Sequence, residues 1–277
     1  MTKCMQAVWR VTRAASALVV LLATATAAAD APDATTIVSR MKQALEPSQS
    51  SVRRMTLTVA QGGSSSKVML GQARGKIAGV NRIVTVVLAP PELQGTTSLV
   101  QEAPASDNNV QWAYIPAIGR VRTLVSPEAF AAFLNSDFTY ADLGFTPLRA
   151  TYTLRGEETK EGVRVYRIEA TLPQQTYYSR IVTRVSADSY LPIDREFYDT
   201  ANQLWKIERF QGVATIDGVP TVLTMDMEDV QAKSRSTLSV TDLKYGMQFP
   251  DSLLQSSELP TAGKAPIWTS LDAKVGR

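Results

Sequence analysis

Two residue types that carry much of protein chemistry are nearly missing from this sequence. It contains no histidine, and its single cysteine is Cys4, close to the N-terminus. Nucleophile–base triads that use histidine, and zinc sites built from cysteine and histidine, are therefore excluded. No disulfide can form within the chain, so the hydrophobic core must stabilise the fold. We accordingly expect a protein that is not an enzyme and that holds no cofactor or metal ion.

Long hydrophobic runs are also scarce, and the clearest one lies near the N-terminus. Residues 14–23 are apolar or small, too short a stretch to span a bilayer comfortably. Three basic residues precede this run: Lys3, Arg10 and Arg13. Ala27-Ala28-Ala29 then offers an A-x-A cleavage site, and the whole order is typical of a secretory signal peptide over residues 1–29. An uncleaved membrane anchor is the alternative.

An excess of either charge is absent once this segment is removed. The full chain has 29 basic and 26 acidic residues, and residues 1–29 contain three of the basic ones and no acidic one. The mature chain therefore has 26 basic and 26 acidic residues. Such a balance gives no general attraction to nucleic acid or to an anionic membrane surface. We expect no nucleic-acid partner and, because of the signal peptide, a periplasmic location.

Helical patterns are few in the rest of the chain. Asp33 is placed to cap a helix whose apolar stripe is Ile37, Val38, Met41 and Leu45, and Pro47 ends it. Ser126-Pro127-Glu128 is typical of a second helix start, with Phe130, Phe133 and Leu134 on its apolar side. The sequence thus predicts one good helix and one short one.

The remaining pattern has the period of two that is typical of strands. The predicted strands are residues 55–60, a strand from 67, 82–88, 111–115, 151–156, 163–172, 178–187, 193–198, 204–210, 222–228 and 237–245. Ten or eleven strands with short connections predict a mainly β (α+β) fold, built on one strongly curved antiparallel sheet. The 248 residues after the signal peptide suffice for one domain, which we place at residues 30–259, with an irregular tail at 260–277.

Motifs that suggest catalysis are better explained by structure. The stretch Gly71–Ile77 differs from a phosphate-binding loop in its spacing and in its last residue. The S-x-x-K matches at Ser39–Lys42 and Ser64–Lys67 have none of the companion motifs of serine–lysine enzymes. Asp226 and Glu228 share one face of a strand, where a solvated outer face is favoured over acid–base chemistry or calcium binding.

One ordered set of motifs resembles the LolA-like family of outer-membrane lipoprotein-sorting proteins. The set comprises Trp112-Ala113-Tyr114-Ile115-Pro116, Arg120-Val121-Arg122, and Ser136-Asp137-Phe138-Thr139-Tyr140-Ala141-Asp142-Leu143. Tyr190-Leu191-Pro192, Phe197-Tyr198-Asp199 and Pro250-Asp251-Ser252-Leu253 follow in the family's order. The resemblance covers roughly residues 35–259, although Asn135 stands where the family usually has glycine.

The resemblance implies an incomplete β-barrel wrapped around one or two helices, with an apolar cavity inside. It implies a periplasmic carrier that binds the acyl chains of lipoproteins or lipids and shuttles them across the cell envelope. An inner-membrane exporter is then a candidate partner, contact with the membrane surface is transient, and the protein is expected to be a monomer. The alternative is an interaction or sensor protein that docks on an inner-membrane exporter or regulatory complex without moving cargo.

Candidate site residues follow from this resemblance together with strand alternation. We expect the cavity to be lined by Trp112, Tyr114, Phe138, Leu223, Met225 and Met227. Alternation groups Trp112 with Tyr114 and Leu223 with the two methionines, but it leaves open which face of each strand is inside. Arg120 and Arg122 are expected at the cavity mouth, with a solvated turn as the alternative.

Overall fold

The computed structural model describes residues 32–102, 109–124, 130–143, 150–172 and 177–271. The predicted signal peptide, and Ser126 to Glu128 of the second predicted helix, lie outside these residues. The α-helices of the described residues are α1 (Ala34–Leu45) and α2 (Leu259–Ala262). The strands are β1 (Ser51–Gln61), β2 (Ser64–Ile77), β3 (Val80–Ala89), β4 (Thr97–Gln101), β5 (Val110–Ile115), β6 (Arg120–Leu124), β7 (Thr151–Lys160), β8 (Val163–Thr171), β9 (Arg180–Ser186), β10 (Pro192–Tyr198), β11 (Leu204–Gln211), β12 (Ala214–Ile216), β13 (Val219–Thr221), β14 (Thr224–Asp229) and β15 (Ser234–Tyr245). Short 3-10 turns are η2 (Phe133–Asn135), η3 (Asp251–Leu254), η4 (Ser256–Glu258) and η5 (Pro266–Trp268).

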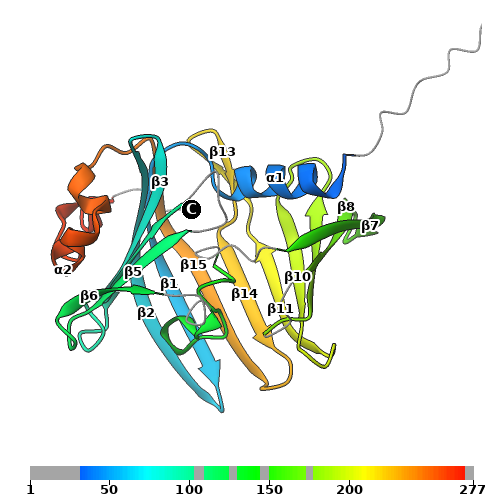
Figure 1. Ribbon diagram of the computed structural model, residues 1–277, viewed down its shortest axis with the longest axis horizontal. Helices are drawn as coiled ribbons and strands as arrows, with labels where there is room; N and C mark the ends of the chain where they lie inside the picture. The colour runs from blue at the N-terminus through cyan, green and yellow to red at the C-terminus, as the bar shows by residue number, and fades with distance from the viewer. Residues whose placement is uncertain (1–31, 103–108, 125–129, 144–149, 173–176, 272–277) are drawn as a thin grey trace, which may run out of the picture. The chain divides into compact units, whose positions relative to one another are not determined.

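Thirteen of the described strands form one antiparallel sheet. Their order is β6-β5-β4-β3-β2-β1-β15-β14-β11-β10-β9-β8-β7, and β12 pairs with β13 in a separate hairpin. The sheet curves strongly but does not close, because β6 and β7 remain its two edges (Figure 1). The prediction of one curved antiparallel sheet is therefore confirmed.

The sequence predicted fewer strands than the described chain contains. The missed ones are short: β4, β6 and the β12–β13 hairpin, which flanks the Asp217-Gly218 turn. Five-residue β4 and β6 show less of the alternation that identifies a strand, and β6 places three polar residues among its five. Short strands of this kind are held by their neighbours in the sheet more than by their own sequence pattern.

Helix α1 forms as its sequence predicts. The Asp33 carboxylate accepts a hydrogen bond of 2.7 Å from the Thr36 backbone N–H at the first turn. Ile37, Val38 and Met41 are buried against the inner side of β8 and β9, where Tyr166 and Val185 are also buried. The helix therefore lies across one end of the concave side of the sheet (Figure 1).

Most of the second predicted helix, residues 125–129, lies outside the described residues, so its formation remains a prediction. The chain that follows forms the 3-10 turn η2 at Phe133–Asn135, where Leu134 and Asn135 have φ values of 51° and 58°. A right-handed helix cannot continue through such a conformation. Asn135 adopts the left-handed region where glycine is common, and asparagine tolerates that region better than most residues.

The two faces of the sheet have separate apolar clusters. Alternate residues of β1 and β2 point to opposite sides, so Met55 and Leu70 belong to the concave cluster and Val52 and Ala73 to the convex one. The concave cluster also contains Phe138, Phe197 and Met227. Near the middle strands the sheet is thus apolar on both sides.

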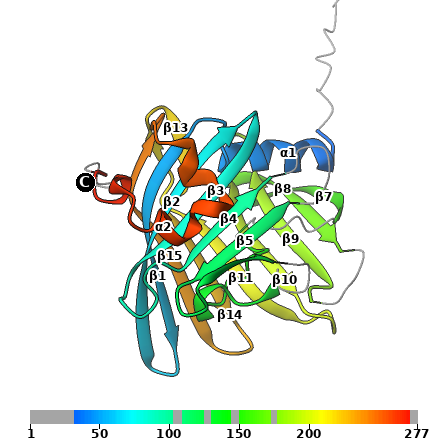
Figure 2. The same ribbon diagram turned by 60° about the vertical axis from the view of Figure 1, so that its left-hand side comes forward.

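Residues 251–271 cover the convex cluster. They include α2 and the 3-10 turns, and they lie outside β2 to β5 (Figure 2). Leu254, Leu259 and Trp268 are almost fully buried there. The tail expected as irregular from residue 260 thus includes most of α2 and all of η5, and it packs on the sheet as far as Leu271.

Candidate ligand-binding cavity

The concave side of the sheet encloses a cavity of about 520 Å³. It lies between the inner faces of the strands, α1 and the segment Phe133–Leu143. Its apolar lining includes Met41, Met55, Leu70, Ile83, Phe133, Phe197, Phe210, Leu223, Met225, Leu238 and Val240. Its charged lining includes Glu46, Arg53, Arg74, Glu102, Asp142, Arg195 and Glu208. The cavity therefore combines apolar walls with buried charges.

The Ser136–Leu143 motif, called the plug below, contributes Ala141, Asp142 and Leu143 to the lining of this cavity. The Asp137 carboxylate accepts hydrogen bonds from the hydroxyls of Ser234 and Ser236 on β15, at 2.5 and 2.6 Å. Lys206 Nζ donates to the Asp137 carbonyl oxygen at 2.6 Å. The Phe138 side chain of this segment is completely buried in the concave apolar cluster. The motif that carries the family resemblance thus anchors a plug to the sheet.

A second set of hydrogen bonds holds the end of the plug. The Asp142 carboxylate accepts from the Thr139 backbone N–H at 2.8 Å and from the Tyr178 hydroxyl at 3.0 Å. Burial raises the pKa of Asp142, and nearby Lys206 opposes that rise. Burial also raises the pKa of Tyr178 well above its usual value. The Asp142–Tyr178 contact is therefore a buried hydrogen bond that joins the plug to the chain just before β9.

Arg74 forms the largest charged cluster at the α1 end of the cavity. Its guanidinium lies 3.1 Å from Glu46, which follows α1, and 3.1 Å from Glu102, which follows β4. Asn81 donates to Glu102 at 2.7 Å. Burial raises the pKa of Glu46, and the charge of Arg74 opposes it. The hydrogen-bonding capacity of both carboxylates is directed mainly to Arg74 and Asn81.

Arg53 also lines the cavity, but its side chain has no hydrogen-bond or ion-pair partner among the described residues. Its Nε is inaccessible to solvent. Burial lowers the pKa of Arg53, and the positive charge of Arg74 acts in the same direction. Glu46 and Tyr245 act in the opposite direction without pairing with it. Arg53 is thus a cation in the cavity wall without a direct counter-ion.

Arg195 and Glu208 form a cross-strand pair between β10 and β11. The Arg195 guanidinium lies 3.2 Å from Glu208 Oε2, while Glu208 Oε1 is buried without a hydrogen-bond partner in the described chain. Burial raises the pKa of Glu208 to about 7, against the charge of Arg195. This carboxyl group therefore titrates near neutral pH, in a chain that has no histidine.

The structure brings four of the six predicted lining residues to the concave side. Leu223 and Met225 line the cavity directly. Phe138 and Met227 are completely buried in the apolar cluster next to it. Ligand contact by these residues remains a prediction.

Trp112 and Tyr114 lie on the convex side instead. Both side chains pack in the cluster that residues 251–271 cover, and neither lines the cavity. They point outward because β5 pairs Trp112 and Tyr114 with Thr123 and Val121, and Val121 belongs to the convex cluster. Alternation grouped the two aromatic residues correctly, whereas their assignment to the cavity does not fit this position.

Arg120 and Arg122 lie on the edge strand β6. Their cross-strand partners are Ile115 and Ala113, so both side chains lie on the concave face, opposite to Val121. Both residues are exposed, and neither lines the cavity. Their role at a cavity mouth remains a prediction.

Sequence reasoning missed the buried charges of the cavity. Arg53 shares its strand face with Met55 and Leu57, and Glu208 shares one with Phe210. A charged residue at an apolar position of an alternating strand is the signal that could have identified them. The signal is lost when only the apolar residues of each strand are considered.

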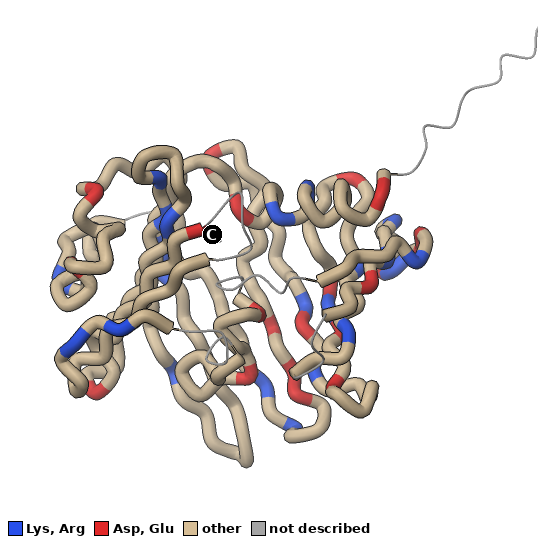
Figure 3. Tube along the Cα trace, viewed as in Figure 1, with Lys and Arg blue, Asp and Glu red and all other residues tan. Residues whose placement is uncertain are grey.

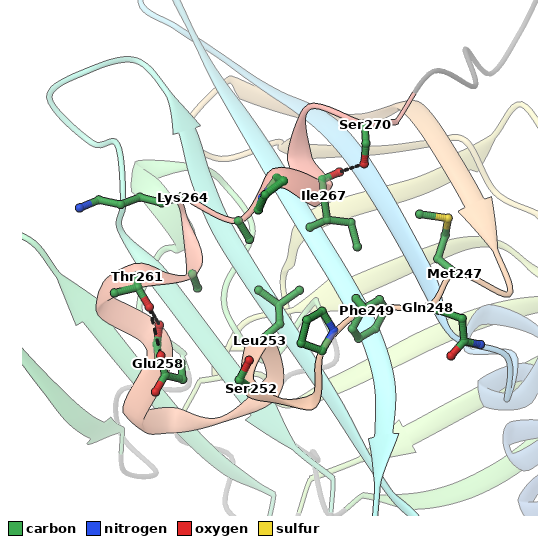
Figure 4. Close-up of a pocket in the computed structure, with 14 residues that line it drawn as sticks. Met247, Gln248, Phe249, Ser252, Leu253, Glu258, Thr261, Lys264, Ile267 and Ser270 are labelled. Carbon is green, nitrogen blue, oxygen red and sulfur yellow. Dashed lines mark hydrogen bonds between the residues drawn. The ribbon is translucent and has the colours of Figure 1, made fainter.

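A second hollow of about 510 Å³ lies on the convex side (Figure 4). Phe249 and Leu253 form one part of it, and Ile267 and Lys264 lie across from them in the C-terminal segment (Figure 4). Side chains of residues 247–270 alone line this hollow. It is therefore a gap between residues 247–250 and the segment 251–271 that covers the convex face.

Two kinds of feature are absent from the residues described. No group of three or more acidic, histidine or cysteine side chains in this part of the chain is arranged to hold a metal ion. No helix of these residues has the length and hydrophobicity to cross a membrane.

Comparison with known proteins supports the fold and the family. No curated protein sequence matches the chain. A crystal structure of a DUF1329 family protein from Desulfovibrio piger has a TM-score of 0.73 and 26% identity, over 81% of this chain and 96% of that one. An outer-membrane lipoprotein-sorting protein domain from Vibrio parahaemolyticus has a TM-score of 0.73 and 23% identity, over 81% and 97%. A LolA superfamily protein from Nitrosomonas europaea has a TM-score of 0.64 and 17% identity, over 81% and 98%.

The last two structures show a shared fold. A family model described as an uncharacterized protein matches residues 79–261, about two thirds of the sequence. This range contains the plug motif and most of the strands that line the cavity. The chain therefore belongs to this family of uncharacterized proteins, and it shares its fold with the LolA superfamily protein.

Proposed function

We propose that this protein is a periplasmic carrier that binds acyl chains of lipoproteins or lipids in its concave cavity and moves them across the cell envelope. The observation that carries this proposal is the cavity of about 520 Å³, which is bounded by α1, the sheet and the Ser136–Leu143 plug. Pockets for small ligands commonly have volumes of about 300–1,000 Å³ and mostly apolar walls. The family, and the N-terminal sequence typical of a signal peptide, support the same function.

The energetics of acyl-chain burial suit such a cavity. Each buried methylene contributes about 0.8 kcal/mol, so one long acyl chain gains on the order of 10 kcal/mol. The methionines at positions 41, 55 and 225 provide flexible, polarizable walls that adapt to different chains. A carrier must also release its cargo, so we propose that part of this gain is offset by movement of the elements that bound the cavity.

Native mass spectrometry tests the proposal directly. The mature protein is purified from periplasm without detergent, and a discrete added mass that fragments to acyl chains is expected. A bare protein mass that stays unchanged after incubation with envelope lipids would contradict a carrier. That result would favour the alternative, a sensor or interaction protein that docks on an inner-membrane complex.

A pair of variants connects the added mass to the cavity. Met225→Trp places a larger side chain in the cavity wall and should greatly reduce the fraction of lipid-bound protein. Met69→Trp is the matched control, since Met69 lies on β2 with 45% of its surface exposed. Equal lipid loading of both variants would place the cargo elsewhere.

A further inference from the structure

Arg53 differs from the other arginines of the cavity. Arg74 is paired with Glu46 and Glu102, and Arg195 is paired with Glu208. The Arg53 side chain has neither a hydrogen bond nor an ion pair within the described chain, and its Nε is closed off from solvent. A guanidinium presents five N–H donors, so its binding capacity here is unused.

The neighbours of Arg53 do not supply the missing anion. Arg74 is a second cation, and it binds both nearby carboxylates. The Tyr245 hydroxyl is 3.0 Å from the Thr221 hydroxyl, with which it shares a hydrogen bond. Arg53 is partly buried with its Nε closed off from solvent, and proteins normally provide charges that are drawn out of water with a counter-ion. The wall of this cavity therefore has a place for an anion that the described chain does not fill.

Apolar side chains continue directly from this place. Met55 follows Arg53 on the same face of β1, and it is opposite Leu70 of β2. Leu238 lines the cavity from β15, which is next to β1 in the sheet, and Met225 lines it from β14, the strand after that. A molecule with an anionic head at Arg53 can thus lay an apolar chain along these residues toward the plug.

We propose that Arg53 binds the anionic head group of the cargo, and that the cargo is an acidic lipid with a carboxylate or phosphate head. This inference rests on the proposed carrier function and names its substrate class. Guanidinium groups bind carboxylates and phosphates through paired hydrogen bonds, so the shared chemistry of the two heads is recognised alike.

Calorimetric titration of lipid-free protein tests the proposal with three probes of equal chain length: dodecanoate, dodecyl phosphate and dodecanol. Arg53→Met retains much of the side-chain volume and removes the charge. It should weaken binding of the preferred anionic probe about 10- to 100-fold and leave dodecanol binding unchanged. The anionic probe that loses more affinity identifies the head group as a carboxylate or a phosphate.

Arg54→Met is the matched control for this substitution. Arg54 is the next residue, points to the convex face and pairs with Asp242 at 2.9 Å. The control variant should bind all three probes like the unmodified protein. Because Arg53→Met removes an unpaired cation, it should also raise the thermal unfolding temperature of the lipid-free protein, whereas Arg54→Met should lower it.

The possible outcomes distinguish a failure of the head-group site from a failure of the carrier function. If none of the probes binds the unmodified protein, the carrier function itself is wrong. If dodecanol binds as tightly as the anionic probes and Arg53→Met changes nothing, the head-group site is wrong and the carrier function stands. Equal losses for dodecanol and the anionic probes would show that Arg53 only shapes the cavity, which also overturns the proposal.

Discussion

The two faces of the sheet differ in how their apolar side chains are covered. Both have apolar side chains along the middle strands, yet the convex face is covered by residues 251–271 of the chain itself, whereas the concave face retains a cavity of about 520 Å³. Arg54 and Arg82 on the convex face donate to the backbone carbonyls of Leu271 and Leu254, at 2.6 and 2.9 Å. Arg53 on the concave face has no such partner. The chain thus covers the convex face with its own residues and leaves a cavity on the concave face.

The convex face is itself divided into two halves. Beyond the covered strands, β7 to β11 and β14 present ion pairs to solvent, and charged residues are frequent there (Figure 3). Arg184, for example, pairs with Glu158, Asp194 and Glu196. The C-terminal segment therefore lies where the sheet is apolar and is absent where the sheet is charged. This division indicates that the segment stabilises the fold by covering apolar side chains of the sheet.

The largest effect should come from removing the anchor of the convex face. Trp268 is buried over β2, and its indole N–H donates to the Ala262 carbonyl at 2.7 Å. Trp268→Ala should lower the free energy of unfolding by about 3–5 kcal/mol. Urea unfolding measures this loss. The affinity for dodecanoate, measured at a urea concentration where the variant is still folded, should be unchanged. A variant that unfolds normally but no longer binds would contradict the separation of the two faces.

A matched pair of leucines compares the two faces directly. Leu254 is buried in the convex cluster, and Leu254→Ala should cost about 2–5 kcal/mol because it opens a new void. Leu223 is only partly buried and borders a space that is already empty, so Leu223→Ala should cost about 1 kcal/mol or less. Urea unfolding of both variants checks the difference. Equal costs would mean that the cavity wall is packed as a core.

This division of the faces was only partly predictable from the sequence. Period-two alternation identified the sheet, and it grouped Trp112 with Tyr114. It cannot state which group faces inward, because a segment 130 or more residues away covers Trp112. Whether an alternating strand has one buried face or two depends on what packs on it. The sequence of residues 251–271 does not reveal which part of the sheet this segment covers.

The buried charges escaped prediction for a related reason. Arg53 and Arg54 are adjacent and identical, so local sequence does not distinguish a cavity cation from a surface ion pair. Arg54 pairs with Asp242 on β15 and donates to the carbonyl of Leu271, far along the chain. The Arg53 side chain has no partner among the described residues. By contrast, Asp33 and Ile37 lie within one turn of α1, and their roles were predictable from local rules.

Gly71 tests how closely the convex cover fits. A Cβ atom at this position would lie 2.6 Å from the Trp268 ring, so Gly71→Ala should displace the ring and cost about 1–3 kcal/mol. Combining Gly71→Ala with Trp268→Leu should give less than the sum of the two losses, because the smaller side chain leaves room. Urea unfolding of the two single variants and the double variant measures this coupling. Strict additivity would show that the two residues do not constrain each other.

The pH dependence of stability should show the smallest effect. It is also the most selective test, because the chain has no histidine to titrate near neutral pH. Burial raises the pKa of Glu208 to about 7 in the folded protein, from an ordinary value of 4.5. Between these values the folded state binds a proton that the unfolded state has released, so stability should fall as pH rises from about 4.5 to 7. Asp142 and Glu46 on the same side also have raised pKa values and contribute with the same sign.

Glu208→Gln should therefore reduce this loss of stability, by roughly 1–3 kcal/mol over the interval, without abolishing it. Glu228→Gln is the matched control on the convex face, where hydrogen bonding from Arg209 lowers the pKa of Glu228. The stability that Glu228 provides is lost only as pH falls below the ordinary range for glutamate, so its variant should keep the unmodified slope between pH 5 and 7. Urea unfolding across this interval distinguishes them: if the Glu228 variant changes the slope and the Glu208 variant does not, the groups that titrate near neutrality lie outside the cavity.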